Sequence, residues 1–203
     1  MANKLEQYYL ETKANKWYGY FAVFCRLALA IAWTISGLVK IKGERFAAGL
    51  SSNHPLGHYF DALLLTGYYY TFIGVGQVIV ALLLLIPRTA LLGAIASFPI
   101  ILNICVLTYA VRFEGTRAAT FMLLANLFLL CWDYRRLKFI LPIKQVKIQA
   151  NSINGKPNRN KFPLLFFGGV AATLAAVVYL NTIIYDIRPG NEPAECWNGC
   201  AEN

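Results

Sequence analysis

Charged residues are scarce in this 203-residue chain, where Lys, Arg, Asp and Glu together make up 14%. An ordinary globular domain carries about 25% charged and about 45–50% apolar residues, whereas the apolar share here is 58%. Mean hydropathy is positive. Long apolar runs recur along the chain, so no polar stretch is long enough to form a separate soluble domain. This composition excludes an ordinary soluble protein and places any chemistry in or near a bilayer.

Histidine is nearly absent, with His54 and His58 as the only two. Neither lies in a long apolar run, so paired axial haem ligation within the membrane is excluded. The two are four residues apart, as helical metal ligands are, but Pro55 between them argues against a helix there. We therefore expect no metal site. A glycine-rich phosphate loop and a serine-centred nucleophile motif are also missing.

The N-terminal 19 residues lack the short apolar core and small-residue cleavage site of a signal peptide. They contain polar and aromatic residues instead, among them Lys4, Glu6, Lys13 and Trp17. We therefore expect the first apolar run to remain in place as an uncleaved anchor.

Five apolar runs follow one another along the chain. A membrane-spanning helix needs about 20 mostly apolar residues, with about 17–25 tolerated. The runs near 20–39, 69–86, 90–111 and 163–184 meet this length, and a shorter run near 118–132 follows the polar turn RFEGTR. Backbone amides in lipid must bond within their own segment, so these runs predict helices. The expected fold is all-α, a polytopic membrane helical bundle with five spans.

The net charge of +9 could indicate a nucleic-acid partner, but the basic residues lie between apolar runs rather than in one polar module. With the N-terminus in the cytoplasm, thirteen of the nineteen Lys and Arg residues fall on the cytoplasmic side, against three of the ten acidic residues. The positive-inside rule favours this arrangement. We expect a bacterial inner-membrane protein with a cytoplasmic N-terminus, a periplasmic C-terminus and no nucleic-acid partner.

The basic segment 135–161 is the main cytoplasmic feature. One interpretation is a topological determinant that also lies on anionic lipid, where each basic residue contributes about 1 kcal/mol. The alternative is a docking site for a soluble partner.

Arg26, Trp33, Gly37 and Lys40 are spaced by seven, four and three residues, which places them on one face of the first helix. Ionisable groups in a span usually face the bundle interior or extend to the interface. Arg26 either reaches the inner interface or pairs with a polar residue of another helix. Its candidate partners are Asp133, Gln77 and Asn126.

Amides also occur inside the predicted spans. Between helices they commonly form hydrogen bonds worth on the order of 0.6 kcal/mol each, and the alternative is a polar pocket for a lipid headgroup or a quinone-like ring. The candidate residues of such a quinone or lipid pocket are Arg26, Trp33, Lys40, Gln77, Asn103 and Asn126.

A second group of polar residues is expected over the outer mouth of the bundle. Its members lie between the first two runs and around RFEGTR, and they are Lys40, Arg45, His54, His58, Asp61, Arg112, Glu114 and Arg117.

The five cysteines divide into two groups. Cys25, Cys105 and Cys131 lie in spans, where a thiol behaves as a small apolar side chain. Cys196 and Cys200 lie in the tail ECWNGC, whose Asn-Gly pair favours a turn. In an oxidising periplasm this pair would form a static disulfide. The alternative is a redox-active pair, although thioredoxin-type centres have two intervening residues rather than three.

The sequence RLALAIAWTISGLVKIKG, from Arg26 to Gly43, resembles the first span of the DoxX-like family, in which an arginine opens the helix and a glycine precedes a closing lysine. GVGQVIVALLLLIPRTALLGAIA, residues 74–96, is similar to the glycine-rich second helix, arginine turn and small-residue third helix of that family. Gln77 stands where many relatives have an acidic residue, which argues against a proton-handling role there.

The resemblance covers about residues 20–134 and implies a four-helix DoxX-like core with one additional C-terminal transmembrane helix. Relatives include a subunit of thiosulfate:quinone oxidoreductase and MauE-like proteins linked to disulfide formation in periplasmic partners. No catalytic residues carry over. The expected organisation is a cytoplasmic segment (1–19), the core (20–134), a basic cytoplasmic loop (135–161), a fifth transmembrane helix (162–187) and a periplasmic tail (188–203).

Two functions remain open at this point. The first is an integral membrane subunit of a redox or respiratory assembly, with a quinone or lipid pocket between its helices. The second is a non-catalytic scaffold or accessory subunit of a larger cell-envelope complex. Both imply the lipid bilayer and other membrane or periplasmic subunits as partners. A small-solute transporter is a weaker alternative, because the chain has no visible inverted repeat.

Overall fold

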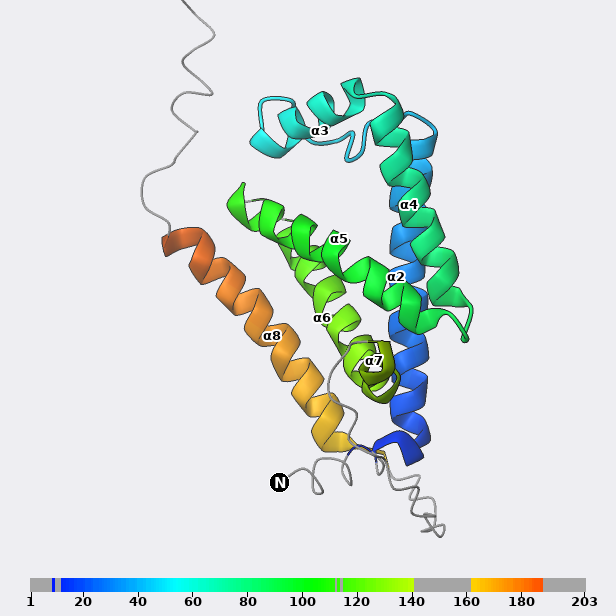
Figure 1. Cartoon of the computed structure of the whole chain (residues 1–203). Coiled ribbons are helices and arrows are strands. Elements are labelled where there is room, and N and C mark those ends of the chain that lie inside the picture. Colours follow the sequence, from blue (N-terminus) through cyan, green and yellow to red (C-terminus); the bar gives the residue numbers. More distant parts are fainter. Residues whose placement is uncertain (1–8, 10–11, 112, 114, 141–161, 188–203) are drawn as a thin grey trace, which may run out of the picture.

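The computed structural model describes residues 9, 12–111, 113, 115–140 and 162–187, and within them the chain forms helices and no strand (Figure 1). The helices are α2 (Lys16–Ile41), α3 (Pro55–Leu65), α4 (Tyr68–Leu85), α5 (Ala90–Ala110), α6 (Thr116–Trp132), α7 (Tyr134–Ile140) and α8 (Leu164–Ile187).

Four of these helices, α2, α4, α5 and α8, are long and apolar enough to cross a membrane. The apolar helix α6 is shorter, at 17 residues. All five begin and end within four residues of the predicted apolar runs. The prediction of an all-α chain with apolar helices long enough to span a membrane is therefore confirmed for the described residues, with four such helices.

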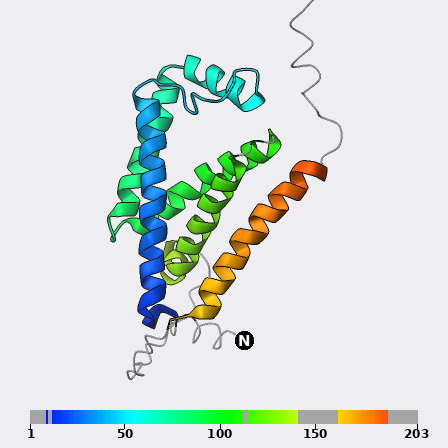
Figure 2. The same ribbon diagram turned by 180° about the vertical axis from the view of Figure 1, so that it is seen from behind.

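Helices α2 and α4 form the most extensively packed pair and run side by side over most of their length (Figure 2). Two glycines allow this close approach. A Cβ atom added at Gly37 would lie 2.7 Å from the Gly74 carbonyl oxygen, and one added at Gly74 would lie 2.7 Å from the Gly37 carbonyl oxygen. The backbones meet where neither residue has a side chain, as small residues permit between membrane helices.

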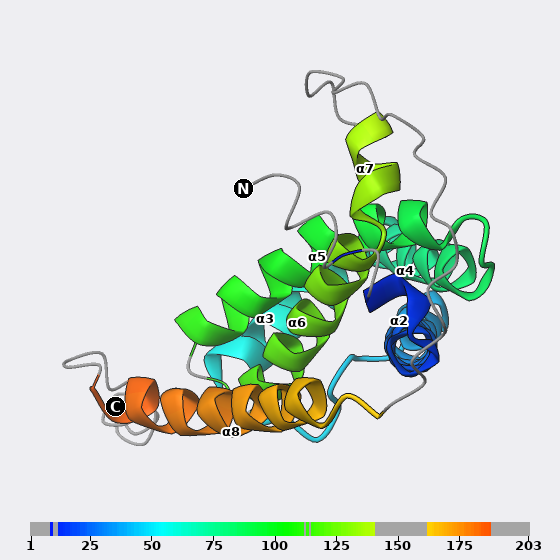
Figure 3. The same cartoon turned by 90° about the horizontal axis from the view of Figure 1, so that it is seen from below.

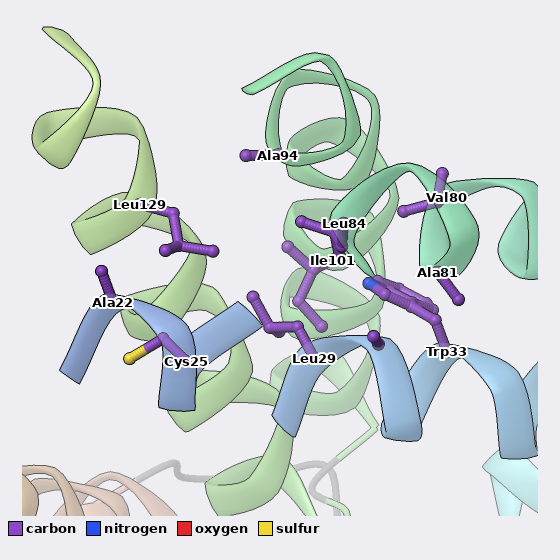
Figure 4. Close-up of a cluster of buried hydrophobic side chains, with 11 residues drawn as sticks. Ala22, Cys25, Leu29, Trp33, Val80, Ala81, Leu84, Ala94, Ile101 and Leu129 are labelled. Atoms are coloured by element: carbon purple, nitrogen blue, oxygen red, sulfur yellow. The ribbon is translucent and has the colours of Figure 1, made fainter. Parts of the chain in front are cut away.

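The apolar core lies where α2 and α4 meet α5 and α6. Figure 4 shows side chains from all four helices converging there. Leu29, Trp33, Leu84 and Ile101 are each no more than 1% exposed, which makes them central to the core. The buried set is completed by Ala22, Cys25, Ala30, Val80, Ala81, Ala94 and Leu129.

Helix α8 lies beside α6 and diverges from the rest of the bundle toward its C-terminal end (Figure 1). None of the residues in its most apolar stretch is buried. Aromatic rings anchor its first turns, with Phe166 4.6 Å from Tyr18 and 5.4 Å from Phe21 between ring centroids. Seen from below in Figure 3, α6 lies between α5 and α8 over much of its length.

Two short helices that the sequence did not predict mark the two ends of the bundle. Helix α3 lies across one end, which we call the α3 end, and α7 follows α6 at the other, which we call the α7 end (Figure 1). Pro55 begins α3 rather than interrupting a helix, because a proline at the first helical position loses no intrahelical hydrogen bond. The Nδ1 atom of His54 caps the helix by accepting from the Leu56 amide at 3.1 Å.

Candidate functional site

Polar side chains connect the helices inside the bundle. The indole Nε1 of Trp33 in α2 donates to Ser97 Oγ in α5 at 2.9 Å, and both residues are buried. A buried indole N–H normally has such a partner. The bond therefore links α2 to α5 at this one point.

A second connection joins α2 to α4 one turn further along. The ammonium of Lys40 donates to Ser36 Oγ at 2.8 Å and to the Ser36 carbonyl at 3.1 Å. Ser36 Oγ in turn donates to Gln77 Oε1 at 3.0 Å. Lys40 is 5% exposed, and its Nζ lies 4.1 Å from the centroid of the Phe46 ring. Among the described residues no carboxylate forms an ion pair with it.

Asn126 forms the third connection, between α6 and α5. Its Nδ2 donates to the Ala94 carbonyl at 3.2 Å, and the residue is fully buried. Its Oδ1 has no hydrogen-bond partner among the described residues. Asn103 lies elsewhere, on the exposed side of α5.

Arg26 caps the C-terminal end of α4 by donating hydrogen bonds to its last carbonyls. Its Nε donates to the Leu84 carbonyl at 3.1 Å, and Nη2 donates to the Leu85 carbonyl at 3.4 Å. The hydroxyl of Thr89 donates to the Leu83 carbonyl at 3.0 Å. The last carbonyls of a helix have no intrahelical donor, and a cation at this end also suits the helix dipole. Of the two interpretations of Arg26, the one that pairs it with Asp133, Gln77 or Asn126 is therefore wrong.

The six predicted pocket residues are thus not brought together. Trp33, Lys40 and Gln77 lie on the inner faces of α2 and α4, whereas Arg26 and Asn126 serve other contacts and Asn103 faces outward. A surface hollow at the α3 end is lined by Gly43, Leu64, Thr66, Gly67, Tyr68, Tyr70 and Thr71, and by none of the six. Helical spacing identified the polar faces but not the helix that each would meet.

Asp133 belongs to a cluster at the α7 end. Lys13 Nζ lies 3.1 Å from Asp133 Oδ1 and 4.0 Å from the centroid of the Trp132 ring. The hydroxyl of Tyr9 donates to the Trp132 carbonyl at 2.9 Å. Burial, and then the charge of Asp133, raises the pKa of the Tyr9 phenol, which keeps this donor protonated. The N-terminal segment is thereby tied to the end of α6.

Part of the predicted outer cluster is present at the α3 end. Arg45 forms an ion pair with Asp61 and donates to the Leu50 carbonyl at 2.6 Å and the Gly57 carbonyl at 3.2 Å. A hydrogen bond from Ser52, followed by the contact with Arg45, lowers the pKa of Asp61. These bonds hold the loop before α3 against that helix.

Of the remaining members of that cluster, His58 lies close enough to Asp61 to act on its charge, and others lie apart from the ion pair or outside the described part of the chain. The charge of His58 contributes to lowering the pKa of Asp61, and Arg117 is exposed on the first turn of α6. Arg112 and Glu114 lie outside the described residues.

Three cysteines lie in described helices. Cys25 and Cys105 are buried, and Cys131 is exposed. Cys105 Sγ lies 3.8 Å from Thr120 Oγ1 of α6. The predicted pair Cys196 and Cys200 lies outside the described residues, as does most of the basic segment, residues 141–161.

Sequence reasoning missed the small hydroxyl residues that connect the helices. Ser36 and Ser97 accept hydrogen bonds from Lys40 and Trp33, and the Tyr70 hydroxyl donates to the Glu44 carbonyl at 2.8 Å. The signal for the two serines is a hydroxyl residue inside an apolar run, whereas Tyr70 is the last of three consecutive tyrosines and nothing in the sequence distinguishes it from the other two. For Ser36 the signal also includes a lysine four residues later, on the same face.

No family model and no solved structure matches the chain. Among curated proteins, the uncharacterized protein YwoB of Bacillus subtilis strain 168 is 35% identical over 133 residues. The match covers 63% of this chain and 85% of that relative. Since this identity extends over most of the relative's length, the chain belongs to the same protein family as YwoB.

Proposed function

We propose that the chain is an integral membrane subunit that acts as a scaffold or accessory component of a larger cell-envelope complex rather than as its catalyst. The observation that carries this proposal is the use of the interior polar groups. Trp33, Ser36 and Asn126 form hydrogen bonds between helices, and Arg26 caps α4. Groups engaged in this way hold the bundle together instead of facing a ligand.

The surface of α8 supports the same proposal. This helix is anchored by aromatic rings at its first turns, while large apolar side chains further along remain exposed, including Tyr179 at 67% and Leu180 at 53%. The exposed apolar side of such a helix could pack against a membrane-spanning helix of a partner protein. The basic segment 135–161 and the cysteine-bearing tail would supply further docking surfaces on either side of the membrane.

The proposed topology has five crossings, with α6 as the shortest, a cytoplasmic N-terminus and a location in the bacterial inner membrane. The distribution of charge in the fold supports it. In the described part of the chain, Lys13, Lys16, Arg88, Arg135 and Arg136 lie at the α7 end with a single carboxylate, Asp133, whereas the α3 end carries Lys40, Lys42, Arg45 and Arg117 together with Glu44 and Asp61. The α7 end is therefore the more positive of the two. The positive-inside rule then places the α7 end in the cytoplasm. Single-cysteine labelling at Arg136 and at Ala48 from outside intact cells tests it, and only the second should react.

The second candidate function is a DoxX-like subunit of a redox or respiratory assembly that holds a quinone or an anionic lipid. Lys40 is the observation that favours it. Its ammonium is buried without a paired carboxylate in the described part of the chain and is linked through Ser36 to Gln77. A buried cation of this kind is costly in a membrane. Two of its three N–H groups donate to Ser36, and a quinone carbonyl or a headgroup oxygen would accept from the third.

One experiment separates the two candidates. The full-length chain is taken from native membranes into lipid nanodiscs, and its quinone content and co-purifying subunits are quantified. The scaffold proposal expects a partner at fixed stoichiometry and no more quinone than empty nanodiscs contain. About one quinone per chain, lost in Lys40→Met but retained in the matched control Lys42→Met, would contradict it and support the redox subunit. Lys42 is a suitable control because it is exposed two residues away.

A further inference from the structure

The face of α5 that points away from the bundle forms a continuous stripe. Its exposed residues are separated by seven, four, three and four positions, a spacing that keeps them on one side of a helix. Two of its members, Leu92 and Val106, are 53% and 62% exposed. The opposite side of α5 carries the buried residues Ala94, Ser97, Ile101, Cys105 and Thr108. The stripe consists of Leu92, Pro99, Asn103, Val106 and Ala110.

Asn103 is a polar residue on this otherwise apolar stripe. Its side chain is exposed, and no hydrogen bond to its amide occurs among the described residues. It lies seven residues before the end of α5, which is about 10 Å along the helix. The hydrocarbon core of a bilayer is about 30 Å thick, so this short side chain faces lipid tails that offer neither donor nor acceptor.

Pro99, on the same stripe, removes one backbone donor from α5. A proline has no N–H, so the carbonyl of Ile95, four residues earlier, lacks the hydrogen bond that an α-helix normally provides. Side chains on a helix lean toward its N-terminus, so the Asn103 amide is directed toward the turn that contains Pro99. Polar groups exposed at membrane depth normally find a partner in protein.

We propose that this stripe of α5 is the contact surface for a second copy of the chain, in which the two Asn103 amides bond to each other across a two-fold axis. An amide carries both a donor and an acceptor, so an identical amide satisfies both groups at once. Two copies inserted in the membrane in the same orientation have Asn103 at the same depth, so the two amides can meet without a shift of either chain. A two-fold interface uses the same patch on both subunits, and the other stripe residues are apolar and uncharged.

This proposal does not depend on the proposed scaffold function, since a redox subunit could dimerise through the same surface. Its first test is disulfide cross-linking in native membranes, using full-length chains whose own cysteines are replaced by serine or alanine. Asn103→Cys and Val106→Cys are expected to form cross-linked dimers on mild oxidation. Leu82→Cys is the matched control, because Leu82 is 55% exposed on another apolar helix, α4, and this variant is expected to remain monomeric.

The second test measures association by energy transfer between labelled full-length chains in phospholipid vesicles over a range of protein-to-lipid ratios. A hydrogen bond between membrane helices typically contributes about 0.6 kcal/mol. Losing two of them therefore lowers the association constant roughly eightfold. Asn103→Leu should therefore weaken association by about that factor. Asn181→Leu is the control, because the Asn181 amide donates to the Val177 carbonyl of its own helix at 3.0 Å, and it should leave association unchanged.

Three outcomes would overturn the proposal. They are a chain that stays monomeric at every ratio, equal cross-linking by Leu82→Cys and Asn103→Cys, and cross-linking of Asn103→Cys to a different protein instead of to a second copy. Unchanged helical content and melting temperature in Asn103→Leu would confirm that the bundle itself is intact.

Discussion

Arg26 completes the hydrogen bonding of a helix other than its own. It lies in α2, and its guanidinium donates to the carbonyls of Leu84 and Leu85, the last two residues of α4. Pro87 lies just after this end of α4 and cannot donate a backbone N–H to it. A charged residue in an apolar span is therefore explained by backbone groups at a helix end.

Replacing Arg26 tests this role. In Arg26→Leu the two carbonyls lose their donors. One of these bonds is partly buried and the other is exposed, so the loss should cost about 0.5–1.5 kcal/mol, the usual net contribution of a hydrogen bond. We expect a lower melting temperature in detergent, with partial recovery in Arg26→Lys because an ammonium can still reach one carbonyl. Thermal unfolding followed by circular dichroism measures the effect. Equal melting temperatures for the leucine variant and the native chain would contradict the capping role.

The five long helices are predictable from the sequence because hydropathy depends only on residues that are neighbours in the chain. The partners of the polar residues are not. Arg26, Trp33 and Lys40 were correctly grouped on one face of the first span, yet they bond to three different elements. Asp133 pairs with Lys13 instead of Arg26 because the N-terminal segment folds back against α6. The partner of each polar residue depends on which helices pack beside its own helix. The spacing of residues within one helix carries no information about that packing.

At the scale of single elements, α2 and α4 pack closely because glycine is present at both points of contact. A Cβ at position 74 would lie 2.7 Å from the Gly37 carbonyl oxygen and 2.8 Å from Lys40 Cβ. Backbone cannot move out of the way as a flexible side chain can. The two helices would therefore have to separate.

Gly74→Val is expected to destabilise the bundle by about 1–3 kcal/mol, the usual cost of overpacking. Gly76→Ala in the same helix is a matched control, because an added Cβ there meets nothing within 4 Å. Since alanine favours a helix more than glycine does, this control should be neutral or slightly stabilising. Denaturation in mixed micelles compares the two variants, and equal destabilisation by both would refute the packing argument.

The sequence did not predict the short helix α3, because its eleven residues are too few to be recognised as a membrane span. Its start nevertheless has a signature, since His54 caps the helix and Pro55 occupies the first helical position. The loop before it is held by Arg45 and Asp61. These contacts join residues 16 positions apart, and no local periodicity reveals them.

The pH dependence of α3 follows from Asp61. The hydrogen bond from Ser52, and then Arg45, lowers the pKa of Asp61 in the folded chain below its unfolded value of about 3.9. Its contribution to stability is therefore present above pH 4 and is lost as pH falls through the folded pKa. Amide hydrogens in residues 45–61 should exchange faster in Asp61→Asn than in the native chain at pH 6, and the difference should shrink as pH falls through the folded pKa of Asp61. Comparing both proteins at each pH cancels the intrinsic exchange rate.

At the scale of the whole molecule, the bundle consists of a tightly packed part and an arm. Helices α2, α4, α5 and α6 share the buried core, whereas the most apolar stretch of α8 has no buried residue. The arm is attached mainly through Phe166 and its neighbouring rings at the α7 end. Its opposite end therefore has little support from the rest of the described chain, which suits a helix that completes its packing against a partner.

The attachment of α8 can be weakened without disturbing the core. Phe166 lies 4.6 Å from Tyr18, 5.4 Å from Phe21 and 6.0 Å from Phe128 between ring centroids. Aromatic pairs contribute about 0.5–1.5 kcal/mol each beyond the area they bury, so Phe166→Ala should release α8 while the other helices remain packed. Tyr179→Ala is the control, because Tyr179 is 67% exposed on the same helix. Spin labels at Leu127 of α6 and Val178 of α8 would report a broader distance distribution in Phe166→Ala alone. An unchanged distribution would mean that contacts other than these rings hold the arm in place.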